Sequence, residues 1–357
     1  MTIQQSDMER YNPLLMLKEV MAQTPYRHKR WGERKFRYKF VLRCLINPVT
    51  TIKYFNELCH LSQPRTLIIH RPLLPAKIQR PYLYTGLSIR CRAKAILEHY
   101  QFVQSFPESK IKKILLSEEQ ILLAHLEGKN DALVDIYCGP CGYDREGELT
   151  LTLCFNDTPL ARLSFSFIRH EGKQIALVAG LQGPSKHVGP QVIRNATKDC
   201  YGLFPKRMLY EAFATLMQAC NVDEIYAVSE NNHVYRQLRY LFQKKKTFVA
   251  SYSEFWESLN GVKKGALYHL PSQVMRKAPE SIPSKKTRRV SETLSYSGYN
   301  NTRGQQPLPV ELFHTRMCRS CYRSADLFEI CIATGWLNTE CLASEKRGIK
   351  PSLSLML

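Results

Sequence analysis

The chain has 357 residues, enough for one large domain or two ordinary ones with a sizeable core. Hydrophobic residues make up 44% and charged residues 23%, a balance that excludes a disordered protein. Lysine and arginine number 51 against 31 acidic residues, and the net charge of +20 predicts an anionic partner such as nucleic acid or acidic lipid. The alternative is that the basic residues only solvate the exterior.

The sequence predicts neither a transmembrane helix nor a signal peptide. A membrane span needs about 20 nearly uncharged apolar residues, and Arg43 and Lys53 interrupt the most apolar stretch. The first residues carry Asp7 and Glu9, which do not suit an export signal. We therefore expect a cytoplasmic protein, with or without peripheral attachment to the inner membrane. The 12 cysteines are then expected to be reduced thiols.

Residues 1–110 are predicted to be a basic, mainly helical region. A short helix is expected at Leu14–Met21. Between Arg27 and Arg43, eight basic residues are interleaved with aromatic ones, and helical spacing places apolar and cationic side chains on adjacent stripes. The candidate polyanion-binding residues are Arg27, Lys29, Arg30, Arg34, Lys35, Lys39 and Arg43.

This basic helix suits an acidic lipid surface, or single-stranded RNA through base stacking and phosphate pairing. The alternative is a docked helix whose apolar stripe lies on the domain and whose lysines face water. Pro48 is expected to end the helix. Further helices are predicted at 52–60 and Gly86–Phe106, with a proline-punctuated connector between them at 64–81.

Residues 111–289 are predicted to form a mixed α+β domain. The segment Ser117–Gln120 is either a helix cap or strand-like. Period-two alternation and turn residues predict an antiparallel meander of four strands, at Ala132–Tyr137, Glu148–Phe155, Leu160–Ile168 and Gln174–Leu181. Helices and strands then alternate and imply a mixed, mainly antiparallel sheet. These later elements are Gln191–Asp199, Lys206–Cys220, Glu224–Val228, Val234–Leu241, Thr247–Ser251, Glu254–Leu259 and Gly265–Leu270.

Residues 290–357 are expected to be a tail with little pattern. The stretch Ser297–Pro309 is rich in Ser, Asn, Gly, Gln and Pro and is expected to be unstructured. The tail holds seven basic and six acidic residues, so almost all of the excess positive charge lies before residue 290.

The order of the predicted elements resembles that of N-acetyltransferases (the GNAT fold), in which an antiparallel meander leads to a glycine-containing turn and a helix that hold a coenzyme pyrophosphate. Segment Gly180–Lys198 has the corresponding place, and amides at a helix N-terminus favour anions. Gln182-Gly183-Pro184 matches only part of the signature Gln/Arg-x-x-Gly-x-Gly/Ala. A coenzyme-A-dependent acyltransferase would use Gln182, Gly183, Lys186 and Gly189. Otherwise the loop is structural and no cofactor is expected.

Two cysteine pairs are weighed as redox or metal sites. Cys138-Gly139-Pro140-Cys141 matches a thioredoxin centre, but that chemistry needs the first cysteine at a helix N-terminus. A strand is predicted to follow, so we expect a tight turn between strands. Cys318 and Cys321 form a second pair, whose distance from the first is far from that of a zinc ribbon, and no metal site is expected.

Candidate acid–base groups are His187, His233, His269, Glu230 and Tyr235, but an ordinary surface or core position is the favoured interpretation of each. Loop Ser229–Asn232 follows a strand, where ligands often bind in mixed sheets. No complete catalytic constellation is present, so catalytic residues stay unassigned.

Several segments resemble the VirK/YbjX family of enteric and related bacteria. They are Gly180–Pro184, Ala196–Arg207, Ala227–Ser229, Tyr252–Trp256 and Ile282–Lys286. The resemblance covers residues 10–287 and implies a virulence-associated accessory protein that supports production or surface presentation of envelope virulence proteins. It supplies no catalytic residues. The chain departs from the family at Asn260, where a glycine is expected, and after Arg289. An RNA-binding post-transcriptional factor is a further alternative.

Overall fold

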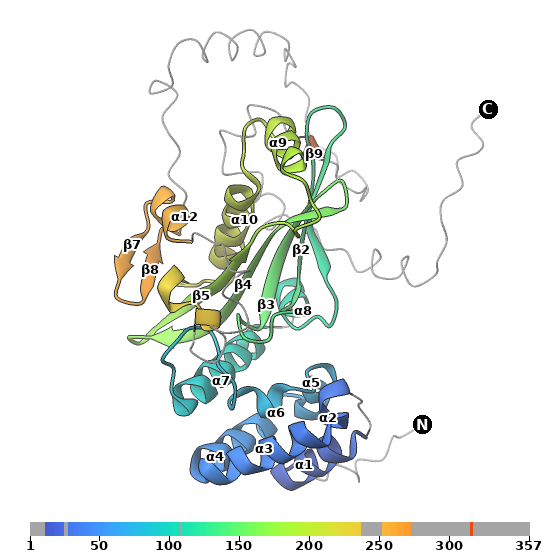
Figure 1. The fold of residues 1–357 in the computed structure, drawn as a ribbon, viewed down its shortest axis with the longest axis vertical. Helices are drawn as coiled ribbons and strands as arrows, with labels where there is room; N and C mark the ends of the chain where they lie inside the picture. The colour runs from blue at the N-terminus through green and yellow to red at the C-terminus, as the bar shows by residue number, and fades with distance from the viewer. Residues whose placement is uncertain (1–10, 25–27, 108, 237–251, 273–314, 317–357) are drawn as a thin grey trace, which may run out of the picture.

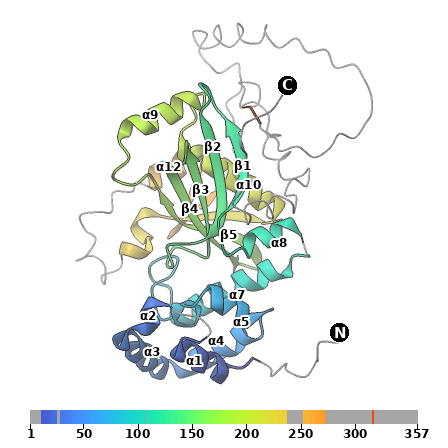
Figure 2. The ribbon, with the colours of Figure 1, turned by 90° about the vertical axis from the view of Figure 1, so that its right-hand side faces the viewer.

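A computed structural model describes residues 11–24, 28–107, 109–236, 252–272 and 315–316. Helices come first in the chain and a large sheet follows (Figure 1). Helices α1–α6 gather at one end of the molecule, and α9 lies at the opposite end of the sheet (Figure 2). This arrangement is α+β, as predicted from the sequence.

Eight helices precede the first strand in the described part of the chain. Proline occupies the first turn of four of them, where its missing N–H breaks no helical hydrogen bond. The helices are α1 (Pro13–Ala22), α2 (Lys29–Gly32), α3 (Arg34–Ile46), α4 (Pro48–Cys59), α5 (Pro64–His70), α6 (Leu74–Lys77), α7 (Ile89–Ser105) and α8 (Lys110–Leu115).

Two predictions for the helical region need correction, and the predicted end of the basic helix at Pro48 is confirmed. The basic helix is broken at Glu33, whose extended backbone separates α2 from α3. Pro48 follows the end of α3, but it also begins α4 directly. The connector at 64–81 was wrong in part because Pro64 starts α5 and Pro75 lies inside α6. Proline marks helix starts here as often as helix ends.

Eight strands form one mostly antiparallel sheet with the order β7-β8-β6-β5-β4-β3-β2-β1. Strands β1 to β5 pair antiparallel in sequence, so the predicted meander is confirmed. Strand β6 runs parallel to β5 and antiparallel to β8. The two-residue β9 (Thr315–Arg316) pairs beside β1. The strands are β1 (Ile121–Glu127), β2 (Leu133–Pro140), β3 (Leu149–Phe155), β4 (Thr158–His170), β5 (Lys173–Gln182), β6 (Glu224–Val228), β7 (Val262–Lys264) and β8 (Leu267–Leu270).

Two helices form the crossover between parallel strands β5 and β6. They are α9 (Pro190–Asp199) and α10 (Pro205–Ala219), both predicted from the sequence. Helix α12 (Ser253–Ser258) precedes the β7–β8 hairpin, and Asn260 after it has a φ of 63°, the left-handed conformation in which the family's glycine was expected. The predicted helix Val234–Leu241 is described only as a 3₁₀ turn at Val234–Arg236. The predicted strand Thr247–Ser251 lies outside the described residues.

Both faces of the sheet are covered. Alternate residues of β5 divide between two cores: Ala176 and Val178 pack in the cluster that includes α10, whereas Ile175 and Leu177 pack in the cluster with the N-terminal helices. The N-terminal helices therefore pack against one face of the sheet and form the second hydrophobic core with it. The boundaries at residues 110 and 289 stay predictions.

A buried carboxylate joins the helices to the sheet. Glu148 lies just before β3, and its side chain forms an ion pair with Lys77 at 2.7 Å. The hydroxyls of Tyr82 and Tyr100 each donate a hydrogen bond to it at 2.7 Å. Burial alone raises the pKa of Glu148, but Lys77 and the hydrogen bonds outweigh it and hold the pKa below its ordinary value. Glu148 is therefore an ionised, fully satisfied core group.

A single substitution of Lys77 should be strongly destabilising. Lys77→Met leaves the Glu148 carboxylate buried without its cation, and we expect a loss of about 3–5 kcal/mol in the free energy of unfolding. The control is Lys94→Met, which removes a lysine that is 70% exposed from its pair with Glu98 and should cost no more than about 0.5 kcal/mol. Urea unfolding measures both, and equal losses would contradict the role given to the buried pair.

His99 on α7 is a second buried titratable group, next to the same cluster. Its Nδ1 accepts a hydrogen bond from the backbone N–H of Phe167 at 3.2 Å, and its ring stacks on that phenyl group. Burial lowers the pKa of His99 to about 4. The neutral imidazole is thus the form that fits the fold.

We expect the protein to lose stability as the pH falls below 6.5. In the unfolded chain His99 binds a proton with its ordinary pKa, whereas in the folded chain burial lowers this pKa to about 4. Between pH 6.5 and 4.5 the loss should be about 2–3 kcal/mol. Glu148, with its lowered pKa, adds to the loss only at lower pH. Urea unfolding across this range should show a flatter dependence for His99→Gln than for the wild type, and identical slopes would refute the assignment.

Candidate functional site: a cationic pocket

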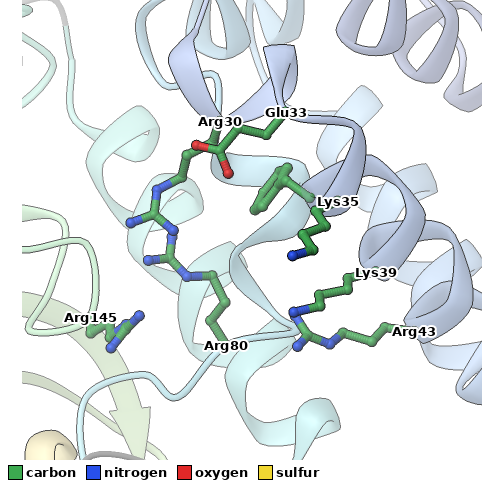
Figure 3. A pocket seen from close by; sticks show the side chains of 8 residues that line it. Arg30, Glu33, Lys35, Lys39, Arg43, Arg80 and Arg145 are labelled. Carbon is green, nitrogen blue, oxygen red and sulfur yellow. The ribbon is translucent and has the colours of Figure 1, made fainter. Parts of the chain in front are cut away.

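A pocket of about 240 Å³ lies where α2, α3, the segment after α6 and the β2–β3 loop meet (Figure 3). Six cationic side chains, one carboxylate and one phenyl ring line it. They are Arg30, Lys35, Lys39, Arg43, Arg80, Arg145, Glu33 and Phe36. Segments far apart in the sequence therefore bring positive charge to one place.

Helix α3 supplies three of the cations because they are spaced by four residues. Lys35, Lys39 and Arg43 lie on one face of the helix and point the same way (Figure 3). The neighbouring stripe is docked: Phe40 is buried, and the Trp31 ring packs edge-on against it at 4.9 Å. The Trp31 indole also donates a hydrogen bond to the Pro72 carbonyl at 2.7 Å. Docking thus fixes which way the cationic stripe faces.

Arg80 anchors the opposite side of the pocket. Its side chain is only 9% exposed and forms an ion pair with Asp144 at 2.9 Å. The Arg80 carbonyl accepts a hydrogen bond from Arg92 at 2.5 Å. The guanidinium groups of Arg80 and Arg30 lie next to each other (Figure 3). A buried arginine held in this way is positioned before any ligand arrives, unlike a flexible surface lysine.

The β2–β3 loop connects the pocket to the buried cluster. Its Asp144 holds Arg80, and the carbonyl of Arg145 accepts the Leu83 N–H at 2.7 Å. Glu146 is buried and accepts a hydrogen bond from Gln182 at 2.9 Å. Gly147 has a φ of 150°, and a Cβ there would lie 2.4 Å from the Phe165 carbonyl oxygen. Consecutive residues therefore alternate between the pocket wall and the core.

Sequence reasoning missed this loop, which it took only as a turn. The available signal was the run Asp144-Arg145-Glu146-Gly147-Glu148, four charges between two apolar strands. Charges that close to buried strands need partners. The partners lie more than sixty positions earlier, at Lys77 and Arg80, so the spacing gives no hint of the pairing.

The electrostatics of the pocket favour a bound anion. Like charges gathered around about 240 Å³ raise the free energy of the empty site, and an anion reverses this. Guanidinium groups offer planar pairs of donors that match phosphate oxygens, and ammonium groups add point charges. Phosphate-type oxyanions are therefore the ligands that this lining fits.

The structure gathers only some of the predicted polyanion-binding residues. Arg30, Lys35, Lys39 and Arg43 line the pocket. Lys29 and Arg34 are exposed and do not line it, because Glu33 turns the chain between the two helices. Arg27 lies outside the described residues. Arg80 and Arg145 were not predicted from the sequence.

The predicted coenzyme loop is arranged differently. Gln182 at the end of β5 donates its side-chain amide to Glu146. Gly183 lies near the aliphatic part of Lys206, and Lys186 is exposed. Gly189 is the N-cap of α9, whose first turn receives no side-chain cap. The four residues thus face different surroundings.

The cysteine motif lies partly within a strand. Cys138 is fully buried in β2, and burial raises the pKa of its thiol to about 12. A thiol held neutral in this way is a poor nucleophile. The expected tight turn starts later than predicted, after Pro140. The described residues contain no group of His, Cys, Asp or Glu that could hold a metal, and Cys318 and Cys321 fall outside them.

The structure brings together only two of the five candidate acid–base groups, His233 and Tyr235, whose ring centroids are 5.4 Å apart. His187 is exposed before α9, and His269 lies on β8 with its Nε2 3.8 Å from Glu224. His233 is fully buried, 3.6 Å from the Glu146 carboxylate. Glu230 forms an ion pair with Arg236, and Tyr235 stacks under Arg145. Tyr235 thereby reaches Arg145, a residue of the cationic pocket.

Comparison with known proteins places the chain in a family. Among the described helices, none is long and apolar enough to cross a membrane. The uncharacterized protein YbjX of Escherichia coli strain K12 is 37% identical over 261 residues, which are 72% of this chain and 79% of YbjX. An uncharacterized protein of Haemophilus influenzae is 29% identical over 110 residues, 31% of this chain and 36% of that protein.

The model of the family DUF535, described as a protein of unknown function, matches residues 29–290. This range includes every residue that lines the pocket. The resemblance to VirK/YbjX is confirmed, and the chain belongs to the DUF535 family, with YbjX among its relatives.

Proposed function

We propose that the protein is a non-catalytic accessory factor that binds a phosphate-bearing anion in the cationic pocket. The observation that carries this proposal is the convergence of six cations from three segments on one space. If the positive charge only solvated the surface, a buried arginine held in place by an ion pair would not be needed. Arg80, held by Asp144, is such a residue. In the biological role that the VirK/YbjX resemblance implies, the protein supports production or surface presentation of envelope virulence proteins from the cytoplasmic side.

The size of the pocket supports a compact ligand. Pockets for whole drug-sized molecules measure about 300–1,000 Å³, and this one measures about 240 Å³. A phosphate or pyrophosphate group fits such a space, with the rest of a larger ligand outside it. The pocket therefore suits recognition of a phosphorylated group on a larger partner.

Charge reversal inside the pocket should weaken anion binding. For Lys39→Glu/Arg43→Glu we expect at least about tenfold weaker binding of inorganic pyrophosphate in calorimetry, because charge-assisted hydrogen bonds are lost and repulsion is added. Binding should also become less sensitive to salt. The matched control, Lys29→Glu/Arg34→Glu, changes the net charge equally outside the pocket and should bind almost as well as the wild type. An equal loss of pyrophosphate affinity in both variants would show that the net charge of the protein, and not the pocket, attracts the anion.

A second candidate, a GNAT-like acyltransferase, is supported by the sheet. Strand β5 carries an extra residue, Ala179, opposite β4, and its parallel pairing with β6 ends at Val178–Ala227. Beyond that point β5 continues to Gln182 without a β6 partner, and the loop that would hold the coenzyme follows. Here the Trp256 indole donates a hydrogen bond to the Val228 carbonyl at 3.1 Å, and Trp256 is buried there. This side chain argues against a coenzyme in that place.

Calorimetry with acetyl-coenzyme A distinguishes the two candidates. We expect no binding at the ends of β5 and β6, because the Trp256 indole already occupies the Val228 carbonyl. Any weak uptake through the coenzyme's phosphates should disappear in Lys39→Glu/Arg43→Glu. Micromolar binding that survives in this variant and is lost on substituting Lys186 would instead favour the acyltransferase.

A further inference from the structure

Exposed apolar side chains are concentrated beside the cationic pocket. Seven of the twelve exposed large hydrophobic residues in the described part of the chain lie between residues 38 and 52. Tyr38 is one of them, and the other six form what we call the apolar ridge: Val41, Leu42, Leu45, Ile46, Val49 and Ile52. Leu45 is 70% and Val49 76% exposed. Single exposed apolar residues scattered over a surface are ordinary, but this many on one short segment indicate a contact site.

Helical geometry places the ridge directly beside the pocket. Each residue of α3 turns by about 100°, so Leu42 and Leu45 follow the cationic stripe of Lys35 and Lys39 on the side away from the buried Phe40, and Ile46 lies between these two lysines. Helix α3 therefore carries a buried stripe, a cationic stripe and an exposed apolar stripe in that order. After Asn47 the ridge continues on α4, whose Val49 and Ile52 lie opposite its buried residues Tyr54, Phe55 and Leu58.

We infer that the ridge and the pocket together dock the protein on an acidic lipid bilayer. The ridge enters the boundary between headgroups and acyl chains, and the pocket takes the phosphate of a lipid headgroup. This inference rests on the anion-binding function proposed above. Interfacial helices bind membranes by this combination, in which apolar burial and attraction to anionic lipid act together.

The chemistry of the surface favours lipid over other partners. RNA binding needs several exposed aromatic planes for stacking. Trp31 and Phe40 are buried, Tyr38 alone is aromatic among the seven exposed residues between 38 and 52, and Leu, Ile and Val offer no such plane. A second copy of the chain would bring two cationic stripes close together, which costs free energy. An acidic bilayer satisfies both the cationic stripe and the ridge in one contact.

The test measures binding to two kinds of vesicle by co-sedimentation. The wild type should bind vesicles of equal parts phosphatidylcholine and phosphatidylglycerol, and should not bind phosphatidylcholine alone. Leu45→Ser/Val49→Ser/Ile52→Ser should lower partition to the acidic vesicles by at least about tenfold, because three apolar side chains no longer enter the bilayer. The matched control, Leu133→Ser/Phe204→Ser/Val262→Ser, removes three exposed apolar side chains elsewhere and should bind like the wild type.

Pyrophosphate binding, measured on the same variants, separates the inference from the proposed function. The ridge variant should keep pyrophosphate affinity, which also shows that it is folded. A ridge variant that binds acidic vesicles as the wild type does would overturn the docking inference and leave the pocket intact. Wild-type binding to single-stranded RNA but not to vesicles would also overturn it. If the wild type binds neither acidic vesicles nor pyrophosphate, the proposed function is overturned as well.

Discussion

The ion pair between Lys77 and Glu148 is the interaction on which the arrangement of the molecule depends. Two charges at 2.7 Å in the core are costly to desolvate, and they are stable here only because Tyr82 and Tyr100 complete the hydrogen bonding. Glu148 belongs to the sheet, and its partners belong to the N-terminal region. The helices are thus held in one orientation by polar geometry as well as by apolar packing, which alone tolerates sliding.

That orientation is what creates the cationic pocket. Arg80 lies three residues after Lys77, and Asp144 lies four residues before Glu148. Two ion pairs therefore join the same two segments, one in the core and one at the pocket wall. A shift of the helices that broke the first would also separate Arg145 from Arg80 and from the stripe on α3. Stability and the proposed anion recognition therefore depend on the same connection, and a change in either segment should affect both.

The sequence was informative wherever a local pattern decides the structure. Period-two runs located strands β2 to β5, and β6 was predicted at its observed bounds, Glu224–Val228. The stripe of Lys35, Lys39 and Arg43 was also recognised. Arg80, Arg145 and the pairing of Lys77 with Glu148 could not be found, because they depend on which distant segments meet. Proline misled at Pro64, since the same residue begins helices and terminates them.

The two alternatives weighed for the basic helix turn out not to exclude each other. A docked helix was set against a binding helix, yet α3 buries Phe40 and presents Lys39 toward the pocket at the same time. Docking would make the proposed binding specific. An undocked amphipathic helix would present its whole aromatic stripe to any partner, whereas here Trp31 and Phe40 are buried and mainly cations and aliphatic side chains, with Tyr38, lie outside. The fold therefore limits which side chains of the basic helix are exposed. Glu33 separates α2 from α3, and Arg30 can therefore approach the pocket from the other side.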